Sequence, residues 1–304
     1  MSHDSPRRRA CAQMVVHELL AETEPDYRAN RLEAEARTRD TIVSGAASEA
    51  VATLITIPVV VHVVLGPDAD DVSDAQIQGQ IATLTADYRA QNDDIDRVPE
   101  PWQPLVIDAN VEFALATTDP AGGPTDGITR TETDVPFFRP DNLVKSAAGG
   151  GADPWPTDRY LNFWVCDLGP RLLGYAQFPG GPPETDGVVI AYTAFGSEGT
   201  AQDPFDRGRT ATHEVGHYLG LRHIWGDMNN CTGSDFVEDT PPAQQSNGGK
   251  PQFPHVTCDN APHGDMFMNY MDYVDDQAMF MFSAGQVTRM NATLAGPRQS
   301  LAGL

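Results

Sequence analysis

Side chains able to carry out metal chemistry are concentrated in one short stretch, HEVGHYLGLRH, from His213 to His223. His213 and His217 are four residues apart, so on a helix both imidazoles lie on one face and reach the same point. Gly220 can end that helix with a positive φ and let His223 return as a third ligand. Three neutral imidazoles leave the fourth position of a zinc ion open for water, which is the arrangement of catalytic zinc sites. Glu214 adjoins these ligands, where it can act as a general base on that water.

A second motif follows further along the chain. Residues 268–273 read MNYMDY and are similar to the methionine turn of the metzincin zinc proteases, which share the spacing HExxHxxGxxH. Within the metzincins, the chain resembles the pappalysin family, in particular its small prokaryotic members. The resemblance covers residues 54–295 and, more weakly, the first forty residues. Further stretches that carry it are residues 57–64, 161–166, 174–181 and 233–241.

The resemblance implies an α+β, metzincin-like zinc protease. The upper subdomain, about residues 54–223, would hold a mixed, mostly parallel, twisted sheet and the zinc helix. The lower subdomain, about residues 224–304, would be irregular and end in a C-terminal helix. Residues 1–53 would form an inhibitory pro-segment in front of this catalytic domain of residues 54–304.

Local sequence patterns predict the elements that position the motif. Strands are predicted where apolar, β-branched runs lie between turn residues, at residues 54–65, 111–117, 161–168, 173–178 and 188–192. Helices are predicted at residues 26–39, 74–92 and 208–220, with a last helix after Ser283. Ser73 and Ser283 are each followed, three residues on, by a glutamine, as in a capping box.

The resemblance assigns roles to two residues of the methionine turn. Tyr273 would donate a hydrogen bond to the substrate carbonyl oxygen as negative charge develops on it. A packing role for Tyr273 is the alternative. Met271 would form a soft apolar floor beneath the metal and would not be a ligand.

Substrate binding is expected at two places. An extended peptide would pair with an edge strand made of Gly174, Tyr175 and Ala176. Similar pappalysins cleave before Arg or Lys, so we expect the same preference here. Asp275 and Asp276 follow the methionine turn and would supply a carboxylate to that P1′ side chain.

The expected pro-segment contains a candidate latency ligand, Cys11, whose thiolate would occupy the fourth zinc position. A stray thiol in a disordered tail is the alternative, and Ala12 replaces the glycine that is usual after this cysteine. No Lys or Arg lies between Arg39 and Arg89. Self-cleavage with the expected preference would therefore fall near Arg37 or Arg39.

The other cysteines bear on the cellular compartment. Cys231 and Cys258 flank the irregular segment after the zinc motif, and a pair in this place is a family feature, so we expect a disulfide. Such a bond indicates an oxidising compartment and therefore secretion, although no secretory signal is visible. Cys166 lies in an apolar run and is expected to be a buried, inert thiol.

A loop after the zinc motif offers oxygen ligands for a second ion. Calcium takes about six to eight oxygen ligands, and similar pappalysins hold calcium in this loop. The candidate ligands are Asp235, Glu238, Thr240 and Gln244. The residues alone also allow a solvated acidic turn, and Gln244 replaces an acidic residue, which lowers the ligand charge.

Composition limits the partners. The net charge of −23 over 304 residues argues against nucleic acid and anionic membrane surfaces, and no apolar run approaches the ~20 residues of a membrane span. We expect protein or peptide substrates and a monomer.

Two functions fit these observations. The first is a zinc-dependent endopeptidase made as a latent zymogen. The alternative is a catalytically silent, metal-stabilised binding or adhesion domain. Glu214 favours the first, because a purely structural zinc site needs no general base.

Overall fold

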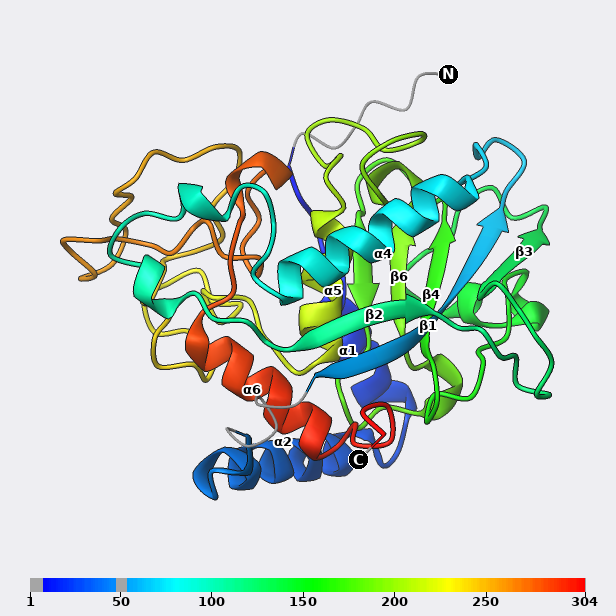
Figure 1. The fold of residues 1–304 in the computed structure, drawn as a ribbon, viewed down its shortest axis with the longest axis horizontal. Helices are drawn as coiled ribbons and strands as arrows, with labels where there is room; N and C mark the ends of the chain where they lie inside the picture. Colours follow the sequence, from blue (N-terminus) through cyan, green and yellow to red (C-terminus); the bar gives the residue numbers. More distant parts are fainter. Residues whose placement is uncertain (1–7, 48–53, 304) are drawn as a thin grey trace.

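A six-stranded, mostly parallel sheet forms the framework of the described residues (Figure 1). The computed structural model describes residues 8–47 and 54–303. The strands are β1 (Ile55–Leu65), β2 (Val111–Leu115), β3 (Ile128–Glu132), β4 (Leu161–Cys166), β5 (Gly174–Ala176) and β6 (Val188–Ala191). Their order is β2-β1-β4-β6-β5, and β3 also pairs with β1. Only β5 runs antiparallel to its neighbour among these strands, so the expected mixed sheet is confirmed.

Strand β1 is long enough to pair with β2 along its first half and with β3 along its second half, so β2 and β3 lie end to end. Residues 55–59 of β1 pair with β2, and residues 61–65 pair with β3. Alternate side chains of β1, such as Ile57 and Val61, pack into the main core, whereas Val64 joins a second core with Trp164 and Cys166. Both faces of the sheet are therefore buried, which accounts for the continuous apolar runs in the sequence. Cys166 is buried, as expected.

Capping residues begin two of the predicted helices. Helix α4 (Asp74–Tyr88) starts at Ser73, whose Oγ accepts a hydrogen bond from the Gln76 amide at 3.2 Å. Helix α6 (Ala284–Ala295) starts at Ser283 with a complete capping box. Helix α4 ends four residues before the predicted residue 92. Short 3₁₀ helices lie in the loops at Ile95–Arg97, Gln103–Leu105, Leu143–Lys145, Ala147–Gly149, Pro183–Thr185, Tyr192–Ala194 and Asp276–Ala278.

The zinc-motif helix α5 (Arg209–Tyr218) lies on the same face of the sheet as α4 and contacts β5 and β6. It begins after Gly208, at φ +71°, and the chain leaves it at Gly220, at φ +89°. Beyond it, up to α6, the described chain is mostly loops and turns, as expected for the lower subdomain. Cys231 and Cys258 form the expected disulfide there, with Cα atoms 5.8 Å apart.

The N-terminal region forms two helices that pack on the rest of the chain. Helix α1 (Gln13–Thr23) packs against β5, and α2 (Tyr27–Val43) lies along α6 (Figure 1). The sequence predicted α2 but missed α1, and it also missed β3. Arg37 and Arg39, the expected self-cleavage region, lie inside α2, so cleavage there requires the helix to unwind. The expected boundary at residue 53 lies outside the described residues.

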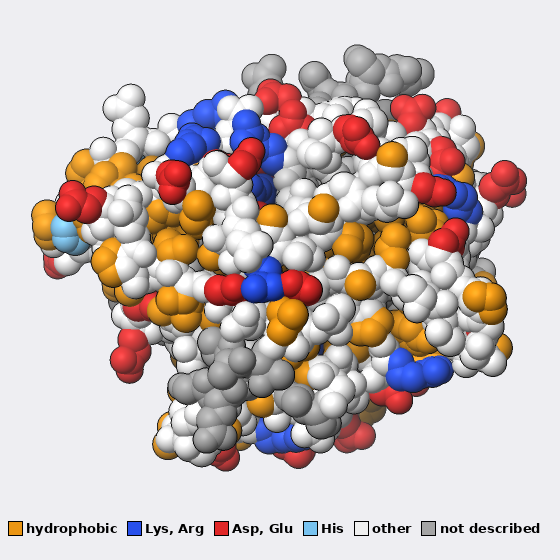
Figure 2. Space-filling model, viewed as in Figure 1, with side chains coloured by type: hydrophobic (Ala, Val, Ile, Leu, Met, Phe, Trp, Pro, Cys, Tyr) orange, Lys and Arg blue, Asp and Glu red, His pale blue; other side chains and the backbone are white. Residues whose placement is uncertain are grey.

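Acidic side chains are frequent on the surface, as the net charge of −23 implies. Asp and Glu side chains are scattered over the face that Figure 2 shows and do not gather into one patch. No helix in residues 8–47 or 54–303 combines the length and apolar character that crossing a bilayer requires.

Candidate active site

Three histidines converge at the end of α5. His213 and His217 lie one turn apart on the helix, and the turn at Gly220 returns His223 to them. The Nε2 atom of His217 lies 3.2 Å from that of His213 and 3.1 Å from that of His223. All three side chains are almost completely buried. The spacing in the sequence therefore produces the expected cluster.

The outer nitrogen of each imidazole is held by a hydrogen bond. The acceptors of the Nδ1 groups are the carbonyl oxygens of Tyr270, at 2.7 Å, and Leu221, at 2.9 Å, and the carboxylate of Asp227. Because a carbonyl oxygen can only accept, the Nδ1 atoms of His213 and His217 carry the proton. Burial lowers the pKa of His217 to about 3 and also lowers the pKa of His213. The imidazoles of His213 and His217 are thus neutral, with unprotonated Nε2 atoms that face each other and Nε2 of His223.

This donor set fits a zinc ion. Nitrogen lone pairs that face one another at about 3 Å repel unless a cation lies between them, and imidazoles oriented through Nδ1 are typical of zinc sites. Cys11 completes the group, since the ligand atoms of the four residues all lie within 4.8 Å of one another. Imidazole and thiolate are both zinc ligands.

Glu214 lies between the expected edge strand and Cys11. A Cβ atom added to Gly174 would approach Cγ of Glu214 to 2.9 Å, so the strand leaves room for this carboxyl only as glycine. The Cys11 thiol donates a hydrogen bond to Oε2 of Glu214 at 3.4 Å. Burial raises the pKa of Glu214 to about 8, and burial with the nearby Glu214 raises the pKa of the Cys11 thiol. A dication at the histidines opposes both shifts.

The methionine turn lies directly beneath α5. A Cβ atom added to Gly216 would come within 2.5 Å of Sδ of Met271, so that sulfur packs against the helix backbone. The Tyr273 ring lies 4.9 Å from the His223 ring and 5.7 Å from the His213 ring, and its hydroxyl donates to the Cys11 carbonyl at 3.4 Å. The hydroxyl therefore points toward Cys11 beside the histidine rings, an orientation that is compatible with the expected donor role.

The expected substrate strand is paired with residues 9–13, which we call the cleft segment. The Ala12 amide donates to the Gly174 carbonyl at 3.0 Å, and the Leu173 amide donates to the Ala10 carbonyl at 3.0 Å. The Ala176 amide donates to Oε1 of Gln13 at 3.1 Å. The bridge between Cys11 and Gly174 is parallel. The neighbouring Tyr175 side chain is buried in the second core.

Arg9 is a site residue that the sequence reasoning missed. It is 3% exposed, forms an ion pair with the buried Asp276 and donates to Oγ1 of Thr210 at 2.9 Å. Its guanidinium lies 4.9 Å from the centre of the Phe205 ring. Of the two expected carboxylates, only Asp276 reaches Arg9, and Asp275 is partly exposed. The position of Arg9 two residues before Cys11, opposite an expected acidic pocket, was the available signal.

The structure brings together two of the four expected calcium ligands. Oγ1 of Thr240 donates to Oδ2 of Asp235 at 2.7 Å, and both side chains are buried. Burial raises the pKa of Asp235 to about 6. Glu238 and Gln244 are exposed.

Comparisons with known proteins agree with this geometry. The family described as pregnancy-associated plasma protein-A, peptidase M43, matches residues 151–295. An extracellular metalloprotease of Arthroderma otae is 31% identical over 246 residues, which cover 78% of this chain and 76% of that protein. Extracellular metalloprotease 1 of Coccidioides posadasii is 41% identical over 140 residues, 43% of this chain and 47% of the relative.

Two solved structures of Tannerella forsythia proteins are also similar. Mature mirolysin in complex with a cleaved peptide is 50% identical, with a TM-score of 0.79 over 82% of this chain and 95% of that one. A promirolysin variant is 45% identical, with a TM-score of 0.87 over 97% of each chain. The match to promirolysin includes the N-terminal helices. The chain therefore belongs to the pappalysin family of metalloproteases, and it is similar over almost its whole length to the zymogen form of one member.

Proposed function

We propose that this chain is the precursor of a secreted, zinc-dependent endopeptidase, with His213, His217 and His223 as the zinc ligands. The observation that carries the proposal is the convergence of three buried Nε2 atoms beside a buried glutamate. A silent binding domain has no use for Glu214 at that point, and the relatives are named metalloproteases. The disulfide and the extracellular relatives support secretion.

Glu214 and Tyr273 then each have a role in peptide hydrolysis. Zinc, when bound, supplies a Lewis acid that lowers the pKa of water to ~7. Glu214 accepts the proton of the attacking water and passes it to the leaving amine. The Tyr273 hydroxyl donates to the substrate carbonyl oxygen as charge develops on it. In the precursor, both Glu214 and Tyr273 are bonded to Cys11.

Latency follows from the same contacts. With zinc bound, Cys11 would lose the proton that it donates to Glu214 here and would hold the metal through its sulfur. The cleft segment also occupies the strand edge that a substrate needs. Ala12 replaces the usual glycine without backbone strain, because its φ of −99° is open to any residue.

Arg9 supports a preference for Arg or Lys at P1′. It fills a pocket whose floor is Asp276, and the Phe205 ring covers its guanidinium. In a substrate cleaved before Arg, the reacting carbonyl precedes the arginine, whereas Cys11 follows Arg9. The cleft segment therefore runs opposite to such a substrate and does not present a peptide bond for cleavage.

We also propose that calcium stabilises the loop of Asp235 and Thr240. Their paired oxygens are buried near the disulfide, and backbone carbonyls with solvent ligands would complete a shell. Added calcium should raise the melting temperature of the precursor, and a temperature unchanged by calcium would contradict the site.

Hydrolysis tests the main proposal. The cleaved peptide bound to mirolysin supports protein and peptide substrates, so the matured protein should hydrolyse casein and Arg-containing peptides. A zinc chelator should abolish the activity, and zinc should restore it. Zinc content measured on the same samples gives a readout besides activity. A protein that binds zinc but cleaves nothing in a broad peptide library would be the silent domain.

A further inference from the structure

A second charged cluster lies at the end of α5 away from Arg9. Arg222 lies next to His223, and Arg289 lies on α6. Both guanidiniums lie over the Phe236 ring, 4.5 and 5.8 Å from its centre. Nε of Arg289 donates to the Gly220 carbonyl at 2.9 Å, which fixes this arginine to the turn of the zinc motif. We call Arg222, Arg289 and Phe236 the paired-arginine site.

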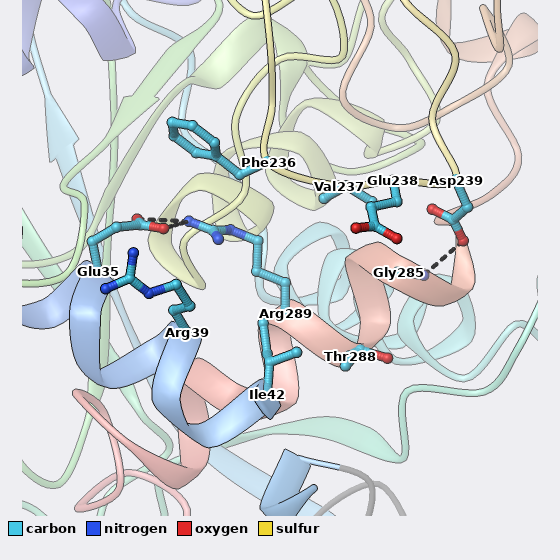
Figure 3. A pocket seen from close by; sticks show the side chains of 10 residues that line it. All are labelled: Glu35, Arg39, Ile42, Phe236, Val237, Glu238, Asp239, Gly285, Thr288 and Arg289. Atoms are coloured by element: carbon cyan, nitrogen blue, oxygen red, sulfur yellow. Dashed lines mark hydrogen bonds and ion pairs between the residues drawn. The ribbon is translucent and has the colours of Figure 1, made fainter. Parts of the chain in front are cut away.

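The carboxylate bound at the paired-arginine site belongs to the N-terminal region. Glu35 of α2 accepts two hydrogen bonds from Arg289, with both Oε atoms 2.7 Å from the same nitrogen (Figure 3). Burial alone would raise the pKa of Glu35, but Arg289, Arg31 and Arg222 lower it below its usual value. The site thus already binds one carboxylate of a peptide segment.

Carboxylates of the catalytic part are mostly engaged elsewhere. Asp227 pairs with His223, Asp235 accepts from Thr240, and Asp239 accepts from Ser283 and Gly285. Nε of Arg222 is buried and lacks a hydrogen-bond partner in the described structure. Removal of α2 would therefore leave two adjacent cations without their principal counterion, in a chain of net charge −23.

The space beside the site admits a peptide. A cavity of about 630 Å³ lies between α2 and the loop of residues 236–239, and it is bordered by Glu35, Arg289 and Thr288 (Figure 3). Because α2 forms one wall, its removal converts the cavity into an open groove that leads to Arg289.

We propose that, in the matured peptidase, the paired-arginine site binds an acidic side chain of the substrate on the N-terminal side of the scissile bond. This inference rests on the proposed endopeptidase function. Arg9 contacts Thr210 in the first turn of α5, and Arg289 contacts Gly220 just beyond its end. The ten residues between them rise about 15 Å, which an extended peptide spans with roughly four to five residues. The acidic residue therefore lies roughly four to five positions before the P1′ arginine.

The test uses zinc-loaded enzyme matured from the full chain and checked by mass spectrometry. The substrates are quenched peptides with one arginine and a single Glu, or Gln as its neutral match, at each of the six positions upstream. Glu should lower KM about three- to tenfold relative to Gln at one or two adjacent positions, as for a partly buried ion pair. High salt should reduce that ratio.

Variants assign the effect to the site. Arg222→Gln should lower the Gln-to-Glu KM ratio about halfway toward one, because Arg289 keeps its own contact, and Arg222→Lys should restore most of the ratio. Arg97→Gln is the matched control, because Arg97 also lies 4.5 Å from a phenylalanine ring centre, that of Phe280, and it should keep the ratio. Equal KM values for Glu and Gln at every position, with normal cleavage, would overturn the subsite alone. Absence of any cleavage would overturn the proposed function and the subsite with it.

Discussion

Two regions of the N-terminal segment, the cleft segment and α2, contact the rest of the chain in different ways. The cleft segment is embedded: Arg9 is 3% exposed and pairs with a fully buried carboxylate, and backbone hydrogen bonds flank Cys11 on both sides. Helix α2 lies on α6 through the partly exposed Glu35–Arg289 pair, beside a cavity of about 630 Å³. Breaking a buried pair costs more than breaking an exposed one. We therefore expect the proposed latency to depend mainly on the cleft segment, and α2 to contribute mainly by covering the surface of α6.

A precursor that cannot process itself allows the two regions to be compared at equilibrium. Glu214→Gln keeps the volume of the side chain but removes the general base. We expect peptide hydrolysis to fall by ~10²–10⁴-fold with zinc content unchanged. Glu198→Gln, at an exposed position, is the control. More than about a hundredth of the parental activity in the Glu214 variant would contradict the general-base role.

Asp276→Asn removes the carboxylate that binds Arg9 of the cleft segment. Arg9 then loses its buried partner, a loss of about 3–5 kcal/mol, and a P1′ arginine loses the same contact. We expect the preference for Arg over a neutral P1′ residue, measured as a ratio of kcat/KM values, to fall on the order of a hundredfold. Asp275→Asn should leave the ratio unchanged. If Asp275→Asn lowers the ratio and Asp276→Asn does not, the carboxylate that binds the P1′ arginine is that of Asp275.

Cys11→Ala removes the proposed metal ligand but leaves Arg9 and the strand pairing. We expect the precursor to become active or to mature on the order of tenfold faster, equivalent to ~1.4 kcal/mol, at matched zinc occupancy. Cys166→Ala removes the buried thiol of β4 and serves as the control. If the Cys11 variant stays as latent as the parent, the latency ligand is another group.

Glu35→Gln removes the ion pair between α2 and Arg289 of α6. An ion pair that is partly exposed contributes up to about 1 kcal/mol, so maturation should speed up less than about fivefold. Glu33→Gln, exposed on the same helix, should have no effect. A larger effect from Glu35 than from Cys11 would reverse the ranking of the two regions.

The features that the sequence predicted depend mainly on local patterns. The turn at Gly220 that groups the three histidines and the capping box of Ser283 involve neighbours in the chain. Family resemblance added the disulfide, which composition alone does not reveal, and the donor role of Tyr273, which stays a prediction.

The features that were missed depend on distant partners. Strand β3 is polar on both faces in sequence and is defined by its pairing with β1. Arg9 and Asp276 are 267 positions apart, and no local pattern distinguishes Asp276 from Asp275. Helix α1 follows directly after Cys11 and packs on β5, so its burial depends on the catalytic part.

The pairing of the cleft segment with β5 also has a kinetic consequence. While the chain is intact, its connection to β1 keeps Arg9 and Cys11 near the cleft at an effective concentration on the order of millimolar. After cleavage, the same segment must rebind as a separate molecule, and its occupancy falls as the solution is diluted. Latency is therefore independent of concentration before the cut. Afterwards the released fragment would be an ordinary reversible inhibitor, and its dilution would make activation effectively one-way.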